Sequence, residues 1–469
     1  MPPTRRTSMS SSLPRPTSTR LLGWSSRRKW PLIVAGLVIL TGMAYSLWWA
    51  PLTHRGPIWI TPGDMWRTFR AAHYVAWGDI GDIYSRQTAL VALPGISVVL
   101  APIAFITYHL GLSESFPFVL GHPTAWVLLG PTELALGAVA LFPLDRLAET
   151  VGVARRHRGW LSLAEGAVLW PMLAIWGHPE DALAIAFAVL GLLAALRGDW
   201  RSTGWWFGLA VVMQPVVVLV IPIAFAYAPF RRWLRLCVRM ALPSVALVTI
   251  PLVTEWAQTS RALFQQPNYP SIDHATPWLA LAPVLTRAHP TVAQHISDHL
   301  ANGAAGFRVV SEKTVAGEVV AAGPGRTIAI VLAVLIGVWV FRRRPSVPQV
   351  VWLAGVALAL RCVFEAVMDP YYLWPPLALL LVVSARDWRR FLITVSAAAS
   401  ATVASYHDTG PWSYWLPIVF LLAVSVAAAY PSETRESRAT GASLDGRPAD
   451  AERSAAELIH TAAAGVALD

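Results

Sequence analysis

The chain has 469 residues, of which 55% are hydrophobic and 14% are charged, and its mean hydropathy is +0.50. Because a soluble domain usually carries about 25% charged residues, this composition excludes a soluble enzyme, an intrinsically disordered protein and a secreted disulfide scaffold. The 23 tryptophans suit a chain that meets two membrane–water interfaces. Both cysteines, Cys237 and Cys362, lie in apolar runs, which predicts neither a disulfide framework nor a metal site.

The two ends of the chain differ from its middle. Residues 1–29 are rich in Ser, Thr, Pro and Arg, and we expect a disordered, basic cytoplasmic segment. The apolar run at 30–50 is long enough to cross a bilayer, and no small-residue cleavage site follows it. It is therefore predicted to be a retained first span that opens a transmembrane domain over 30–430. The composition of 431–469 predicts a disordered cytoplasmic tail.

Further apolar runs continue along the chain. They lie at 88–112, 122–145, 159–177, 180–197, 203–230, 236–254, 327–341, 348–366, 371–385, 390–406 and 412–430. Arginine clusters separate several of these runs, and the positive-inside rule assigns such clusters to the cytoplasm. The net charge of +10 is therefore interpreted as a topology signal and not as a sign of nucleic-acid binding.

All of the arginine clusters face the cytoplasm only if two of the runs are not single crossings. Residues 88–112 must cross zero or two times. Residues 203–230 must cross twice and break near Gln214 and Pro215, because proline interrupts helices. This predicts an all-α, multi-pass plasma-membrane protein of about twelve transmembrane helices with both termini cytoplasmic. Two long segments, 51–121 and 255–326, are then external, and chemistry is expected on the outer face.

The first external segment carries a carboxylate with two arginines at helical spacing. Asp64, Arg67 and Arg70 are three residues apart in turn, which places them on one face of a helix. Asp64 is suited to act as a general base, with the arginines holding a phosphate. The alternative is that Asp64 caps an interfacial helix while the arginines contact lipid phosphates.

Ionisable residues also gather at the start of the run at 180–197. His178, Glu180 and Asp181 flank Pro179, a residue suited to the first turn of a helix. One interpretation is a polar cluster that orients a sugar or assists a base. The other is that the two acids stabilise the positive end of the helix dipole. Both interpretations stay open, since ionisable groups at a membrane boundary are costly.

A single basic residue lies inside a predicted span. Arg361 is followed by Glu365 one helical turn later. An intramembrane charge indicates a functional site, here a phosphate-binding guanidinium, while a bundle-facing pair between Arg361 and Glu365 is the alternative. Tyr371 and Tyr372 follow in a short external turn, and His274 lies in the second external segment.

Together these features resemble the GT-C superfamily of membrane glycosyltransferases. The resemblance is to actinobacterial polyprenyl-phosphate-mannose-dependent α-mannosyltransferases of the glycosyltransferase 87 type and to related arabinofuranosyltransferases. It covers most of 30–430. The matching stretches are 64–84 followed by Pro94-Gly95 and Ala101-Pro102, then 177–181, 204–215 and 361–376.

The resemblance implies roles for individual residues. An early-loop aspartate is the catalytic base in that family, which implies Asp64. The expected donor is a polyprenyl-phosphate sugar, preferably mannose, and the expected acceptor is a cell-envelope glycolipid or polysaccharide. Membrane lipids are the other expected partners, and neither nucleic acid nor a cofactor is expected. A divalent metal is compatible with this chemistry, but no residue pattern supports one. The residues expected to bind substrate are Arg67, Arg70, His178, Glu180, Asp181, Arg361, Glu365, Tyr371, Tyr372 and His274.

Three other functions compete with transfer of mannose. The first is transfer of arabinofuranose from polyprenyl phosphate. The second is transport or flipping of a lipid or sugar, since many transporters have about twelve spans with polar sites near the midplane. The third is a non-catalytic role in assembling the cell envelope. A one-sided cluster of ionisable residues favours transfer over transport.

Overall fold

The structure is a computed structural model of the whole chain. It describes residues 28–52, 63–85, 88, 90–112, 125–268, 270, 274–287, 318–407 and 410–431. The chain divides into one compact unit, Met1–Ala429, and a second unit, Tyr430–Asp469, of which only residues 430–431 are described. The predicted cytoplasmic segments therefore lie almost wholly outside the described residues.

The described part of the first unit is built almost entirely of helices. Its elements are α2 (Lys29–Leu52), α3 (Gly63–Trp77), η1 (Ile80–Asp82), α4 (Gly95–His109), α5 (Trp126–Ala138), α6 (Leu141–Thr150), α7 (Arg155–Ala174), α8 (Pro179–Leu196), α9 (Trp200–Met213), η2 (Pro215–Leu219), α10 (Ile221–Tyr227), η3 (Phe230–Arg232), α11 (Trp233–Thr254), α12 (Trp256–Ser260), η4 (Arg261–Gln265), η5 (Pro277–Leu281), β1 (Val284–Arg287), β2 (Glu318–Val320), α14 (Gly325–Arg343), α15 (Val347–Phe364), η6 (Pro370–Leu373), α16 (Trp374–Ser384), α17 (Trp388–Ala404) and α18 (Pro411–Ala428).

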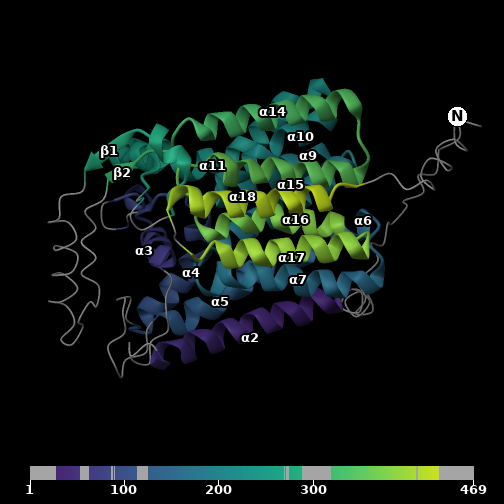
Figure 1. Ribbon diagram of the computed structural model, residues 1–469. Coiled ribbons are helices and arrows are strands. Elements are labelled where there is room, and N and C mark those ends of the chain that lie inside the picture. The colour runs from purple at the N-terminus through teal and green to yellow at the C-terminus, as the bar shows by residue number, and fades with distance from the viewer. Residues whose placement is uncertain are drawn as a thin grey trace, which may run out of the picture. The chain divides into compact units, whose positions relative to one another are not determined.

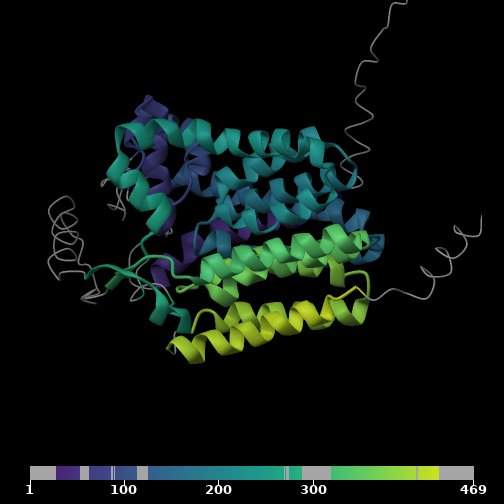
Figure 2. The ribbon, with the colours of Figure 1, turned by 90° about the horizontal axis from the view of Figure 1, so that it is seen from above.

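Long apolar helices lie side by side in this unit (Figures 1 and 2). Six of the described helical segments are long and apolar enough to cross a membrane; they are Trp126–Thr150, Pro179–Leu196, Phe230–Thr254, Gly325–Arg343, Val347–Phe364 and Pro411–Ala428. The prediction of an all-α membrane protein is therefore confirmed. The number of about twelve crossings stays a prediction, and so does the path of 88–112, whose helix α4 has only 15 residues.

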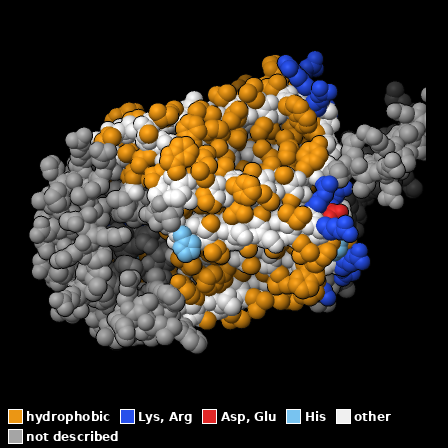
Figure 3. Space-filling view, viewed as in Figure 1, with side chains coloured by type: hydrophobic (Ala, Val, Ile, Leu, Met, Phe, Trp, Pro, Cys, Tyr) orange, Lys and Arg blue, Asp and Glu red, His pale blue; other side chains and the backbone are white. Residues whose placement is uncertain are grey.

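The helices differ in how much of their surface the protein itself covers. In α8, 83% of the apolar stretch is buried inside the protein, whereas the figure is 17% for the segment that contains α11 and 22% for α18. The uncovered positions carry large apolar side chains such as Leu234, Val253 and Phe420, and Figure 3 shows such side chains over the side of the bundle. A helix that is apolar all round and uncovered is suited to lipid contact. We conclude that α8 is central and that α11 and α18 are peripheral.

The run at 203–230 breaks where the sequence predicts. Helix α9 ends at Met213, Gln214 has an extended backbone (φ −150°, ψ 121°), and Pro215 begins η2, which leads to α10. A proline disfavours the helical conformation of the residue before it and cannot donate a backbone hydrogen bond. The predicted break is confirmed, and it frees the Gln214 side chain to point into the bundle.

The two ends of the bundle have different chemistry. At one end, here called the basic end, Lys and Arg side chains gather near α6 (Figures 1 and 3). The opposite end carries β1, β2 and α3, and is here called the strand end. There β1 and β2 pair antiparallel, and a small second core joins α3 to η4 through Ala71, Tyr84 and Ala262.

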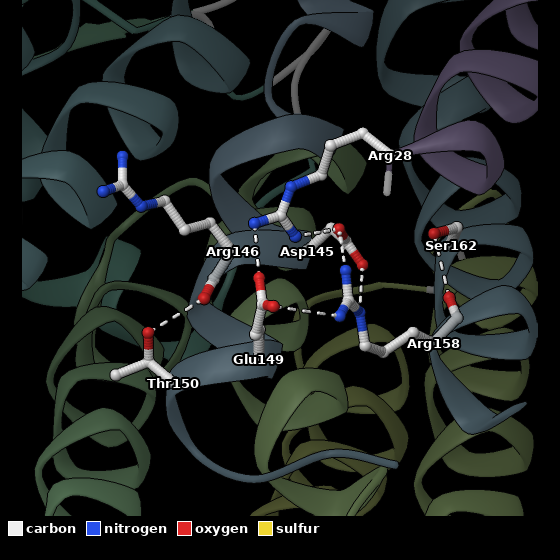
Figure 4. Close-up of polar contacts among 7 residues, drawn as sticks. All are labelled: Arg28, Asp145, Arg146, Glu149, Thr150, Arg158 and Ser162. Carbon is white, nitrogen blue, oxygen red and sulfur yellow. Dashed lines mark hydrogen bonds and ion pairs between the residues drawn. The ribbon is translucent and has the colours of Figure 1, made fainter. Parts of the chain in front are cut away.

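A network of ion pairs fixes three helices at the basic end (Figure 4). Arg158 of α7 donates to both Asp145 oxygens at 2.7 and 2.6 Å, and Arg28, just before α2, bridges Asp145 and Glu149 of α6. The Asp145 side chain is only 3% exposed, whereas that of Glu149 is 52% exposed. Among the residues of this network, Asp145 is therefore the one whose loss would leave buried positive charge uncompensated.

We predict that Asp145→Ala destabilises the protein by about 3–5 kcal/mol, because the buried Arg158 loses both of its short hydrogen bonds and Arg28 keeps Glu149 alone. The matched control is Glu149→Gln, whose exposed pair contributes less than about 1 kcal/mol. The free energy of unfolding in detergent micelles, followed by tryptophan fluorescence, measures both. Equal losses in the two variants would contradict this account of the network.

Candidate functional site

The polar cluster of interest lies at the strand end, where α7 turns into α8. Gly177 has a left-handed backbone (φ +68°) that suits glycine, and its N–H donates to the carbonyl of Leu173. Pro179 then begins α8, and His178 occupies the position just before it. Since α7 starts beside the basic-end network and runs for 20 residues, this turn lies about 30 Å from that network.

Three ionisable side chains meet at this turn. His178 Nδ1 lies 2.6 Å from Glu180 Oε1 and 3.7 Å from Asp181 Oδ2. His178, Glu180 and Asp181 are 6%, 4% and 0% exposed. Because a carboxylate only accepts hydrogen bonds, His178 Nδ1 donates to Glu180. One atom of each side chain lies within 4.8 Å of the others, which is a spacing that suits metal ligands.

Two residues from other helices complete the cluster around Asp181. Gln214, at the break after α9, donates from Nε2 to Asp181 Oδ2 at 3.2 Å. Arg361, near the end of α15, places NH1 4.0 Å from Asp181 Oδ1, which is too long for a hydrogen bond. Among the described residues, neither this Arg361 nitrogen nor this Asp181 oxygen has a hydrogen-bond partner. Both atoms therefore keep capacity for a ligand.

Two tyrosines of η6 form an aromatic wall on the cluster. The Tyr371 ring stacks on His178 with centroids 3.6 Å apart. The Arg361 guanidinium carbon lies 3.4 Å from the centroid of the Tyr372 ring, a cation–π contact. The Cys362 thiol also donates to the Tyr372 carbonyl at 3.3 Å. These contacts hold the imidazole and the guanidinium in fixed orientations.

Glu133 of α5 is a member of the site that the sequence analysis missed. Its side chain is completely buried, and neither carboxyl oxygen has a hydrogen-bond partner among the described residues. It lies close enough to Glu180 and His178 to interact with their charges. An acid in the middle of the apolar run at 122–145 was the available signal, because a carboxyl group in a membrane span is costly.

Glu365 lies close enough to Arg361 for the two charges to interact, but among the described residues its direct ion pair is with Arg326. Helix α15 ends at Phe364, and Glu365 continues in an extended conformation (φ −70°, ψ 143°). Glu365 accepts from Arg326 at the start of α14. The Glu365 carbonyl accepts from the hydroxyl of Thr276 at 2.6 Å. Glu365 thus links the start of α14 and Thr276 to the end of α15.

The remaining predicted site residues lie on other elements. The His274 ring stacks on Tyr414 at 4.5 Å, and the His274 carbonyl accepts from the N–H of Met368, which is a packing role. Asp64 belongs to α3, but its side chain lies outside the described residues. Arg67 and Arg70 are half-buried on the same helix.

Burial and the charge of Arg70 act on His73, which lies one turn further along α3. Burial, followed by the charge of Arg70, lowers the pKa of His73 to about 4. His73 is therefore neutral at physiological pH, and the cationic character of this helix comes from Arg67 and Arg70. Both arginines belong to α3, which lies at the strand end of the bundle (Figure 1).

Comparison of the chain with protein-family models, with curated proteins and with solved structures finds no match. The function must therefore be argued from the residues themselves.

We predict that Gly325→Ala disturbs the pair between Arg326 and Glu365. A Cβ atom at Gly325 would lie 1.7 Å from the Phe364 carbonyl oxygen, so the start of α14 must move away from the end of α15. Overpacking of this kind costs about 1–3 kcal/mol. The control is Gly36→Ala in α2, where nothing lies within 4 Å of the added atom and alanine favours the helix by up to about 1 kcal/mol. Thermal unfolding in detergent compares them; an unaffected Gly325→Ala protein would contradict the close packing.

Proposed function

We propose that this protein transfers a sugar, preferably mannose, from a polyprenyl-phosphate donor to a hydroxyl group of a cell-envelope glycolipid or polysaccharide. The reaction takes place at the strand end of the bundle, on the outer face of the plasma membrane. In this arrangement the basic end faces the cytoplasm with both termini, as the positive-inside rule requires. About twelve crossings connect the two faces.

One observation supports this proposal above the others. Three stretches that resemble membrane glycosyltransferases, 177–181, 204–215 and 361–376, are far apart in the sequence. Their polar residues converge, because Gln214 and Arg361 both approach Asp181 and Tyr371 stacks on His178. A chance likeness between short motifs would give no reason for the three stretches to meet in one buried cluster.

The cluster offers suitable groups for a lipid-phosphate donor. Arg361 keeps an N–H that no described residue accepts, and guanidinium groups bind phosphate oxygens well. Tyr372 fixes that guanidinium from one side. His178 and Glu180 form a rigid, hydrogen-bonded pair beside it, which suits orientation of sugar hydroxyls. The proposed role of Arg361 is therefore to hold the donor phosphate and stabilise its developing charge.

Asp64 is the proposed general base. It removes the proton from the acceptor hydroxyl as the oxygen of that hydroxyl attacks the anomeric carbon of the sugar. The new bond joins the anomeric carbon to the acceptor oxygen, the bond to the phosphate oxygen breaks, and polyprenyl phosphate leaves with the electron pair. The position of α3 at the strand end, the end proposed to face outward, supports this role (Figure 1).

We predict that Asp64→Asn lowers sugar transfer by about 10²–10⁴-fold, because the amide cannot accept the hydroxyl proton. The assay uses membranes with polyprenyl-phospho-mannose and polyprenyl-phospho-arabinose as competing donors, and it measures label in the glycolipid fraction. The matched control is Asp199→Asn at the exposed cap of α9, which should transfer sugar at the wild-type rate. A correctly inserted Asp64→Asn protein with wild-type activity would refute the assignment.

We also predict that Arg361→Lys raises KM for the donor at least tenfold while the protein stays folded. Lysine keeps the charge near Asp181 but loses the planar fork and the stacking on Tyr372. Initial rates at varied donor concentration separate KM from kcat. An unchanged KM would remove Arg361 from the phosphate site.

If the wild-type protein moves a labelled lipid across vesicles without transferring sugar, the transport alternative replaces the present proposal.

A further inference from the structure

The charges of the buried cluster do not balance. Three carboxyl groups, those of Glu133, Glu180 and Asp181, are between 0% and 4% exposed. Arg361 is the cation within ion-pair distance of this group in the part of the chain that the structure describes. With all acids ionised and His178 neutral, the cluster has an excess of two negative charges. An uncompensated charge in an apolar interior costs several kcal/mol, so the cluster needs either protons or a cation.

The unsatisfied atoms point to a ligand. Asp181 Oδ1, Glu180 Oε2 and both Glu133 oxygens lack hydrogen-bond partners among the described residues. Glu133 belongs to α5 and not to the 178–181 turn, and it is close enough to Glu180 and His178 to interact with their charges. This buried acid is therefore an observation independent of the turn itself. Such concentrations of unpaired buried oxygen atoms are rare unless something binds them.

We propose that His178, Glu180 and Asp181 bind one divalent transition-metal ion of the Zn²⁺ or Mn²⁺ kind, with Glu133 as a supporting carboxylate. The ion would cancel the two excess negative charges. An imidazole nitrogen with two carboxylates suits these metals, whereas Ca²⁺ and Mg²⁺ prefer oxygen ligands alone. The proposal rests on burial and charge, and it holds whether or not the protein transfers sugar.

The distances require only small movements. Ligand atoms about 2.1 Å from a tetrahedral ion lie about 3.4 Å from one another. His178 Nδ1 is already 3.7 Å from Asp181 Oδ2, and its 2.6 Å separation from Glu180 Oε1 must lengthen. The proton that Nδ1 shares with Glu180 leaves when nitrogen binds the metal, so binding releases a proton. Gln214 holds Asp181 Oδ2 from the opposite side.

Direct binding to the full-length, tag-free protein in detergent tests the site. Protein treated with EDTA and exchanged into buffer is titrated calorimetrically with ZnCl₂, MnCl₂ or MgCl₂, and elemental analysis gives the metal content before and after. We expect one Zn²⁺ or Mn²⁺ per chain, weaker binding of Mg²⁺, and proton release that depends on the buffer. No metal uptake, or uptake of Mg²⁺ as strong as that of Zn²⁺, would overturn the proposal.

Variants separate this site from adventitious binding. Asp181→Asn should weaken Zn²⁺ binding at least 100-fold, and Glu133→Gln about tenfold, since supporting groups tune affinity by 10–100-fold. Glu133→Gln is an isosteric change at a side chain that has no hydrogen-bond partner among the described residues, so it tests the site even if Asp181→Asn fails to fold. Glu149→Gln at the basic end is the control and should bind like wild type. Equal affinity in Glu133→Gln and wild type would overturn the site. The metal titrations contain no donor sugar, so they do not depend on sugar transfer. A protein that binds metal but transfers no sugar would therefore refute the proposed function and leave the metal site standing.

Discussion

The cost of placing charge inside an apolar helix bundle governs this structure. Only 14% of the residues are charged. Two buried clusters of them lie toward the two ends of the bundle, while Glu165 is buried midway along α7. At the basic end Asp145 receives bonds from two arginines and is fully compensated. At the strand end the carboxyls of Glu133, Glu180 and Asp181 are buried together, and the Arg361 guanidinium approaches Asp181 at 4.0 Å. The cost of burying charge therefore explains both clusters: the basic-end ion pairs hold their helices together, and the strand-end carboxyls need a ligand.

Interruptions in the helices make the strand-end cluster geometrically feasible. A continuous helix would turn Gln214 away from Asp181, but the break before Pro215 lets it donate to that carboxylate. The left-handed Gly177 reverses the chain so that His178 stands at the beginning of α8. The end of α15 sends Arg361 and Glu365 to different partners. Each irregularity places one polar side chain that a straight helix would direct elsewhere.

Several parts of this architecture follow from sequence patterns. Proline chemistry predicts the break at Gln214, and the cost of charge in a span singles out Arg361. The pairing of Glu365 was beyond reach, because it depends on where α15 ends and on the distant Arg326. Glu133 lies near the 178–181 turn because of the way α5 packs against α8. The hydrophobic periodicity of a single helix does not predict which helix packs against it. Local rules thus identify the costly residues, and tertiary contacts choose their partners.

The two charged clusters are coupled through the helices that carry them. The segment Trp126–Thr150 has Glu133 toward the strand end and Asp145 at the basic end. Helix α7 connects Arg158 to the turn that presents His178. Because the ion pairs clamp these helices at the basic end, their relative tilt is fixed there, and α8 packs against α5, α6 and α9 in the centre of the bundle. A rigid scaffold of this kind holds unsatisfied carboxylates in place without letting them collapse onto each other, which is what preorganisation of a charged site requires.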